Sequence, residues 1–189
     1  MAIYHPPTFI NAYLRAKLQA EGFGAVPLFP TMPTDLAAAS QDHRLSLTDL
    51  ITSDNVKLPV TFQGLAGIYD RMFRMRKTAF PHIKCEQVLY YFYSIEEQAV
   101  PKLIELTQHV QDLLDNGDES AEDLNTWAAA KQASSAPLRD NSGNVLPLPY
   151  FHSIKIYQLQ ETRDIVDFAT ARTYAGNKII IDYDWHKSE

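Results

Sequence analysis

The sequence contains none of the common motifs for covalent or metal chemistry, and few of the cysteines that such chemistry often uses. Cys85 is the single cysteine among 189 residues, so no disulfide can form within the chain and no cysteine pair with metal-binding spacing exists. The G-x-S-x-G, P-loop, G-x-G-x-x-G and H-E-x-x-H motifs are absent, and the six histidines are scattered along the chain. We therefore predict that the chain is not an enzyme, and we expect no cofactor and no metal site.

Positive charge is not in excess either. The chain has 17 Lys and Arg against 23 Asp and Glu, which gives a net charge of -6 at pH 7. A chain of this charge is not generally attracted to DNA or RNA, so any nucleic-acid contact would have to be local. No apolar run approaches the roughly 20 residues that span a bilayer, and the N-terminal MAIYHPPTFI has no basic region followed by an apolar core. We expect neither a membrane segment nor a secretory signal.

What is present is the composition of an ordinary globular domain, with 46% hydrophobic and 21% charged residues. The length suits a single domain over residues 1–189. Apolar residues spaced by three and four predict one helix over about 7–21 and a second over about 95–113, and a weaker pattern predicts another helix over 121–133. The two stronger stripes consist of Phe9, Ile10, Tyr13, Leu14 and Leu18, and of Ile95, Ala99, Leu103, Leu106, Val110 and Leu113.

Three segments read as strands. The first, KCEQVLYYFYS at 84–94, is rich in β-branched and aromatic residues on both faces, with Val88, Tyr90 and Phe92 on one and Leu89, Tyr91 and Tyr93 on the other. We expect the domain core to cover one face and a neighbouring subunit to cover the other. Two further strands are predicted over 150–160 and 177–186, joined by a charged connection with room for a strand of its own.

These elements predict an α+β fold, in which an antiparallel sheet packs against two main helices. The polar, weakly periodic stretch 35–59 is expected to be a long loop outside the core, and loops of that length are usually functional or mobile. The stretch 134–149, which contains four of the chain's prolines and glycines, is expected to be a flap.

A basic stretch, YDRMFRMRKTAFPHIK, lies at 69–84. Basic residues interleaved with aromatics can bind single-stranded nucleic acid by charge and stacking, and a nucleic-acid-binding protein that uses residues 71–84 is one alternative. The other is an edge strand whose arginines pair with acidic residues of a neighbouring subunit. We favour the second, because the stretch leads directly into an aromatic strand. The predicted interface residues are Arg71, Arg74, Arg76, Lys77, Tyr91 and Tyr93.

The segment DYDWH places Asp182, Asp184 and His186 on one face of the last predicted strand. Two carboxylates and an imidazole could hold a divalent metal ion in a small hydrolase or nuclease. A strand that presents alternate polar residues to solvent has the same pattern. We keep the enzyme as a third alternative and expect the solvent-facing strand.

The order of these segments resembles the tail terminator and neck proteins of long-tailed bacteriophages. The resemblance covers most of the chain and rests on the order of elements rather than on a signature motif. The segments that carry it are INAYLRAKL, PLFPTMPTDL, IYDRMFRMRKTAFPHIKCEQVLYYFYS, VPKLIELTQHVQDLLD, FHSIKIYQLQETRDIVDF and YAGNKIIIDYDWH. The stretches 35–59 and 134–149 exceed the minimal pattern of that family, so another neck ring or a baseplate subunit stays open.

The resemblance implies a structural protein of the virion, assembled in the host cytoplasm. In that family, six copies form a ring that ends the tail tube and joins it to the head. The implied partners are other copies of the chain, the tail tube, the connector or neck proteins, and the sheath if the tail is contractile. DNA would pass through the lumen of the ring without specific recognition, which an acidic subunit suits because DNA is repelled rather than held.

Overall fold

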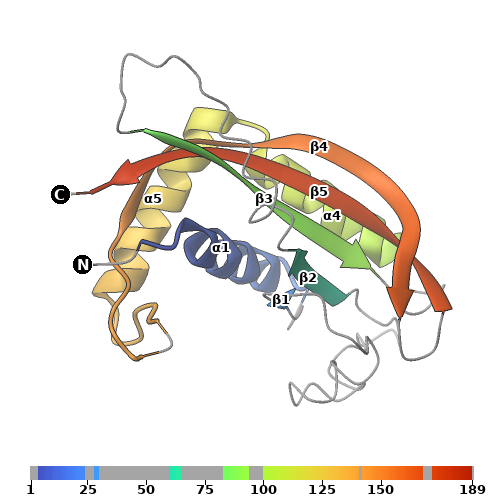
Figure 1. The fold of residues 1–189 in the computed structure, drawn as a ribbon, viewed down its shortest axis with the longest axis horizontal. Helices are drawn as coiled ribbons and strands as arrows, with labels where there is room; N and C mark the ends of the chain where they lie inside the picture. Colours follow the sequence, from blue (N-terminus) through green and yellow to red (C-terminus); the bar gives the residue numbers. More distant parts are fainter. Residues whose placement is uncertain are drawn as a thin grey trace.

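The structure is a computed structural model, and it describes residues 4–23, 28–29, 60–64, 83–93, 100–140, 142–167 and 172–188. It confirms the α+β class, with three helices beside an antiparallel sheet (Figure 1). The elements follow in the order α1 (Pro6–Ala20), β1 (Leu28–Phe29), β2 (Val60–Gly64), β3 (Lys84–Tyr93), α4 (Val100–Leu114), α5 (Gly117–Ala133), β4 (Pro149–Asp167) and β5 (Arg172–Lys187).

The sheet has the strand order β1-β2-β3-β5-β4. All neighbouring strands are antiparallel except β1, which pairs parallel to β2 over two residues. β4 and β5 form one long hairpin that pairs from Pro149 opposite Lys187 to Asp167 opposite Arg172. The predicted charged connection between the two strands is therefore too long, because most of its residues belong to β4 or β5. An outer strand with solvent at its edge tolerates charged side chains. These charged residues interrupt the apolar pattern from which a strand is predicted.

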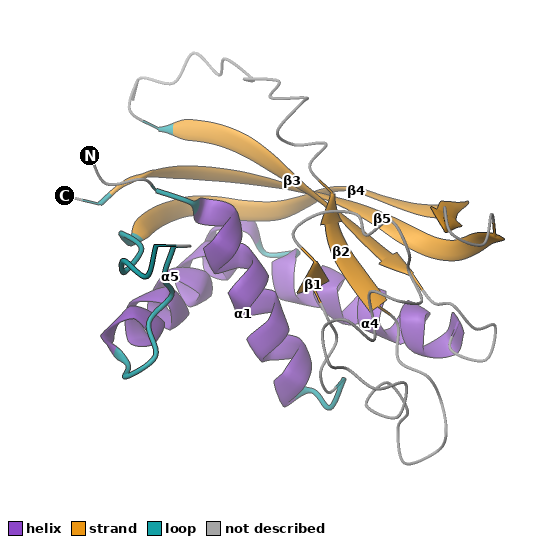
Figure 2. Cartoon of the chain, turned by 60° about the horizontal axis from the view of Figure 1, so that its bottom comes forward, coloured by secondary structure: helices purple, strands orange, loops and turns teal. Residues whose placement is uncertain are grey.

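All three helices lie on the same side of the sheet (Figure 2). Between them and the sheet lies the core, to which β3 contributes Val88, Tyr90 and Phe92, as predicted, each at most 2% exposed. The side chains of Leu89, Tyr91 and Tyr93 lie outside the description. The other fully or nearly buried residues include the α1 stripe, Leu103, Leu106, Val110 and Leu114 of α4, Leu124 and Ala128 of α5, Phe151 and Ile154 of β4, and Ile179, Ile181, Tyr183 and Trp185 of β5.

The helix boundaries show how local sequence sets the fold. α1 begins at Pro6, where a missing N–H is harmless because the first turn has no partner for it. Pro101 is the second residue of α4 and so also lies in a first turn. α5 begins at Gly117, which has φ 42°, four residues before the predicted start. The short turn at 115–116 between the two helices leaves α4 and α5 in contact with the same sheet.

Helices α1 and α5 are joined by a polar contact at the edge of the core. The Tyr13 hydroxyl donates a hydrogen bond to Oδ2 of Asp123 at 2.6 Å, and Nζ of Lys17 lies 2.6 Å from the same oxygen. The pKa of Asp123 is lowered because Lys17 and Tyr13 hydrogen-bond to the charged carboxylate. Burial and the Asp123 carboxylate raise the pKa of Tyr13, so its hydroxyl remains a donor.

The described residues of the stretch predicted as a flap are held against α5. The side chain of Gln132 accepts a hydrogen bond from the Leu138 N–H at 2.7 Å and donates one to the Leu146 carbonyl at 2.5 Å. Within the turn, Oδ1 of Asp140 accepts the N–H groups of Ser142 and Asn144. The predicted long loop at 35–59 lies outside the described residues.

Candidate functional site at the β4 bulge

A β-bulge groups polar side chains on the face of the sheet opposite the three described helices, which is called the helix-free face because no described helix lies on it. Phe151 pairs with Trp185 and Ser153 pairs with Asp184, so His152 is an extra residue in β4. A bulge of this kind sets two residues of one strand opposite one of the other and re-aims their side chains. Tyr150 pairs with His186 just before it. The bulge therefore gathers residues of β4 around the outward-facing Asp184 and His186 of β5.

The bulge is held from outside the sheet by α5. Oδ1 of Asn125 accepts a hydrogen bond from the Phe151 N–H at 2.9 Å, and its Nδ2 donates to the Phe151 carbonyl at 2.7 Å. β4 is the last strand of the sheet, so these two backbone groups have no strand beside them. The Asn125 amide supplies both partners in their place. It fixes the backbone next to His152.

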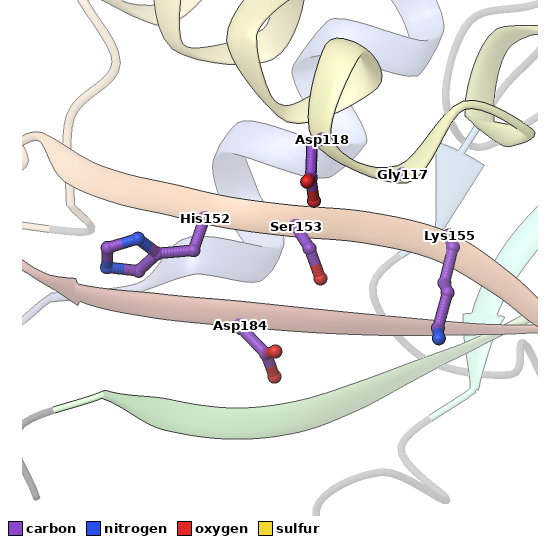
Figure 3. A pocket seen from close by; sticks show the side chains of 6 residues that line it. All are labelled: Gly117, Asp118, His152, Ser153, Lys155 and Asp184. Atoms are coloured by element: carbon purple, nitrogen blue, oxygen red, sulfur yellow. The ribbon is translucent and has the colours of Figure 1, made fainter. Parts of the chain in front are cut away.

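Beside the bulge lies an open hollow of about 590 Å³. It is lined by Gly117, Asp118, His152, Ser153, Lys155 and Asp184 (Figure 3). Asp118 reaches from the start of α5 toward β4, while Ser153, Lys155 and Asp184 extend from the two strands in a common direction. The hollow thus combines two carboxylates with one ammonium and one imidazole. Such a lining suits small polar ligands or cations better than an apolar molecule.

Two histidines lie in direct contact at the same place. Nε2 of His152 and Nδ1 of His186 are 2.8 Å apart, and their ring centroids are 4.8 Å apart. Tyr150 packs against both rings, at centroid distances of 5.2 Å to His152 and 5.1 Å to His186. A hydrogen bond at this distance requires that one facing nitrogen donates and the other accepts. This pair brings two side chains capable of metal binding or acid–base chemistry into direct contact.

The predicted face of Asp182, Asp184 and His186 is confirmed, since the residues that alternate with them are buried. The sequence alone does not show that the three side chains make different contacts. Asp182 accepts a hydrogen bond from Nε2 of Gln87 at 2.6 Å, Asp184 lines the hollow, and His186 contacts His152. Within the described part of the chain, no three His, Cys, Asp or Glu residues lie close enough together to hold a metal ion.

Sequence reasoning missed His152 and Asn125. A signal for the bulge was available, because Phe151 and Ile154 are both core residues and are three positions apart in a strand that should alternate by two. That spacing indicates an extra residue between them. For Asn125 no local signal exists, because its partner Phe151 is 26 residues away and on another element.

The predicted interface residues are only partly within the described structure. Arg71, Arg74, Arg76 and Lys77 lie outside the described residues. Tyr91 and Tyr93 belong to β3, where their backbones pair with Lys178 and Gly176 on one side and with Phe62 and Val60 on the other. The proposed interface role of all six residues stays a prediction. Lys84, the last residue of the basic stretch, lies with Nζ 4.9 Å from the centroid of the Trp185 ring.

Comparison with known proteins adds no relative. No model of a known protein family matches the chain, and no curated protein matches it. Among the helices that the structure describes, none combines the length and the apolar character needed to cross a bilayer.

Proposed function

We propose that this chain is a structural subunit of a multi-chain assembly, and specifically of a ring at the head–tail junction of a tailed bacteriophage. The observation that supports the assembly role is the asymmetry of the sheet. The three described helices lie on one face (Figure 2), and the opposite face presents outward side chains of β4 and β5 such as Tyr150, Asp184 and His186. A second chain could bind that face without any change in the fold.

The outer strand β4 also favours an assembly role. From Lys155 to Glu161 every side chain except Ile156 is exposed, and β4 is an outer strand of the sheet that the described residues form. Exposed outer strands present backbone groups that pair readily with another chain. Three of the five large apolar residues exposed in the described part lie on β4, namely Tyr150, Tyr157 and Leu159. Tyrosine is enriched where protein surfaces meet.

The more specific part of the proposal, a phage tail terminator or neck ring, comes from the order of elements along the sequence. It names other copies of the chain, the tail tube and the connector as partners, with the sheath as a further partner in a contractile tail. The net charge of -6 suits a ring through which DNA passes without being held. The location would be the virion. Another neck ring or a baseplate subunit would share these properties.

Electron microscopy of the purified chain tests this proposal, alone and together with the tail-tube protein of the proposed phage. We expect ring-shaped particles, either spontaneously or on the ends of tubes. The proposal is wrong if the chain stays dispersed in both samples and the tube ends remain bare.

A further inference from the structure

We propose that His152 and His186 together bind a divalent transition-metal ion, for which Zn²⁺ is the simplest probe. This site is independent of the proposed ring, and no motif in the sequence indicated it, because the two histidines are 34 residues apart. Both lie on the helix-free face, on paired strands. Their ring nitrogens face each other at 2.8 Å.

The geometry requires only a small adjustment to accept the ion. Zn²⁺ binds imidazole nitrogen at about 2.0–2.1 Å, so two nitrogens in a tetrahedral site lie about 3.3 Å apart. Rotation of each ring by a few degrees would widen the separation of the two nitrogens from 2.8 Å to about 3.3 Å. The ion would then occupy the space between nitrogens that now share a hydrogen bond.

Both histidines are oriented before any ion arrives. Asn125 fixes the backbone of Phe151 next to His152, and the bulge turns His152 toward His186. Tyr150 packs against both rings. A ligand pair that is already held in place loses little conformational entropy on binding.

The surrounding charges favour a cation and leave room for other ligands. Asp184 precedes His186 by two residues on the same face of β5, and it lines the hollow with His152, Asp118 and Lys155. No third described His, Cys, Asp or Glu is close enough to complete a metal site. The remaining positions would be filled by water or by a group from another molecule, as in open zinc sites. Affinity should therefore be lower than at a closed site with four protein ligands.

The ligand type selects the class of ion. Imidazole nitrogen suits Zn²⁺, Cu²⁺ and Ni²⁺, whereas Mg²⁺ and Ca²⁺ prefer oxygen ligands. We expect Cu²⁺ to bind more tightly than Zn²⁺ at the same pair, following the general order of divalent ions. A large excess of Mg²⁺ should not displace either ion.

Isothermal titration calorimetry with ZnCl₂ tests the site on the full chain, purified without a histidine tag. We expect one ion per chain, and we expect His152→Gln or His186→Gln to weaken binding by about tenfold or more, because one of two nitrogen ligands is lost. Glutamine keeps a polar group in contact with the remaining histidine, so the fold should survive. Circular dichroism checks this.

The matched control is His5→Gln, because His5 is exposed and belongs to the start of α1. This variant should bind Zn²⁺ like the unchanged chain. Equal Zn²⁺ affinity in the His152→Gln, His186→Gln and unchanged proteins would overturn the proposal, as would a complete lack of Zn²⁺ binding by the unchanged protein. Because ring formation is measured separately, failure of the metal site leaves the proposed function untouched.

Discussion

The side-chain amide of Asn125 binds both backbone polar groups of Phe151, accepting its N–H at 2.9 Å and donating to its carbonyl at 2.7 Å. A residue of α5 thus takes the place of a neighbouring strand at the outer edge of the sheet. The contact lies beside the bulge that carries His152. It connects helix packing to the geometry of the candidate site.

Replacing Asn125 by alanine should therefore destabilise the protein. Two backbone groups would lose their partners, and we expect a loss of about 1–3 kcal/mol in the free energy of unfolding. Urea denaturation followed by circular dichroism measures the change. Gln108→Ala is the control, because Gln108 makes an exposed hydrogen bond to Asp112 within α4. Equal stabilities for the two variants would show that the Asn125 contact does not hold the edge of the sheet.

The buried and exposed isoleucines offer a matched test of the core. Ile181 in β5 is 0% exposed, whereas Ile104 in α4 is 59% exposed. Ile181→Ala should cost about 2–5 kcal/mol because it removes buried methyl groups and leaves a cavity. Ile104→Ala should change the free energy of unfolding by less than about 0.5 kcal/mol. Thermal and urea unfolding of both variants decide the matter, and a small effect at Ile181 would contradict the described packing of the sheet against the helices.

The contact between Asp123 and Lys17 predicts a dependence of stability on pH. The pKa of Asp123 is lowered in the folded protein from its ordinary 3.8. Its contribution is therefore fully present above the unfolded pKa and is lost as pH falls through the folded pKa. Asp123 is about half exposed, so the contribution should be below about 1 kcal/mol.

Asp123→Asn tests that dependence. Unfolding free energies of the variant and the unchanged protein should differ at pH 7 and converge as the pH is lowered below about 4. The exposed Asp115 supplies the control, since Asp115→Asn should leave stability unchanged. A difference between Asp123→Asn and the unchanged protein that stays constant down to pH 2 would mean that the charge of Asp123 is not its source.

Several features of the fold were predictable because their patterns depend on nearest neighbours. The α1 stripe at Phe9 to Leu18 and the alternation of β5 at Ile179 to Trp185 each correspond to one buried face. The bulge at His152 was not predicted, since one extra residue shifts the alternation without changing the composition. The contact of Asn125 with Phe151 could not be predicted, because it depends on where α5 lies against β4 in space.

The basic stretch supplies a prediction about assembly. If the arginines pair with acidic residues of a neighbouring subunit, reversing Arg74 and Arg76 to glutamate should place like charges together and prevent assembly. The monomer should remain folded by circular dichroism. Arg15→Glu is the control, because Arg15 is an exposed residue of α1, which packs on the helix-covered face of the sheet. Size-exclusion chromatography with light scattering compares the variants, and normal assembly of the Arg74 and Arg76 double variant would show that these arginines are not interface residues.

Native mass spectrometry of the purified full chain measures most directly whether this protein is an assembly subunit. The account predicts a closed oligomer of identical chains, with six copies as the expected number, at micromolar protein concentration and near-physiological salt. Addition of the proposed tail-tube partner should increase the oligomeric fraction. A monomer as the only species under both conditions would contradict the account.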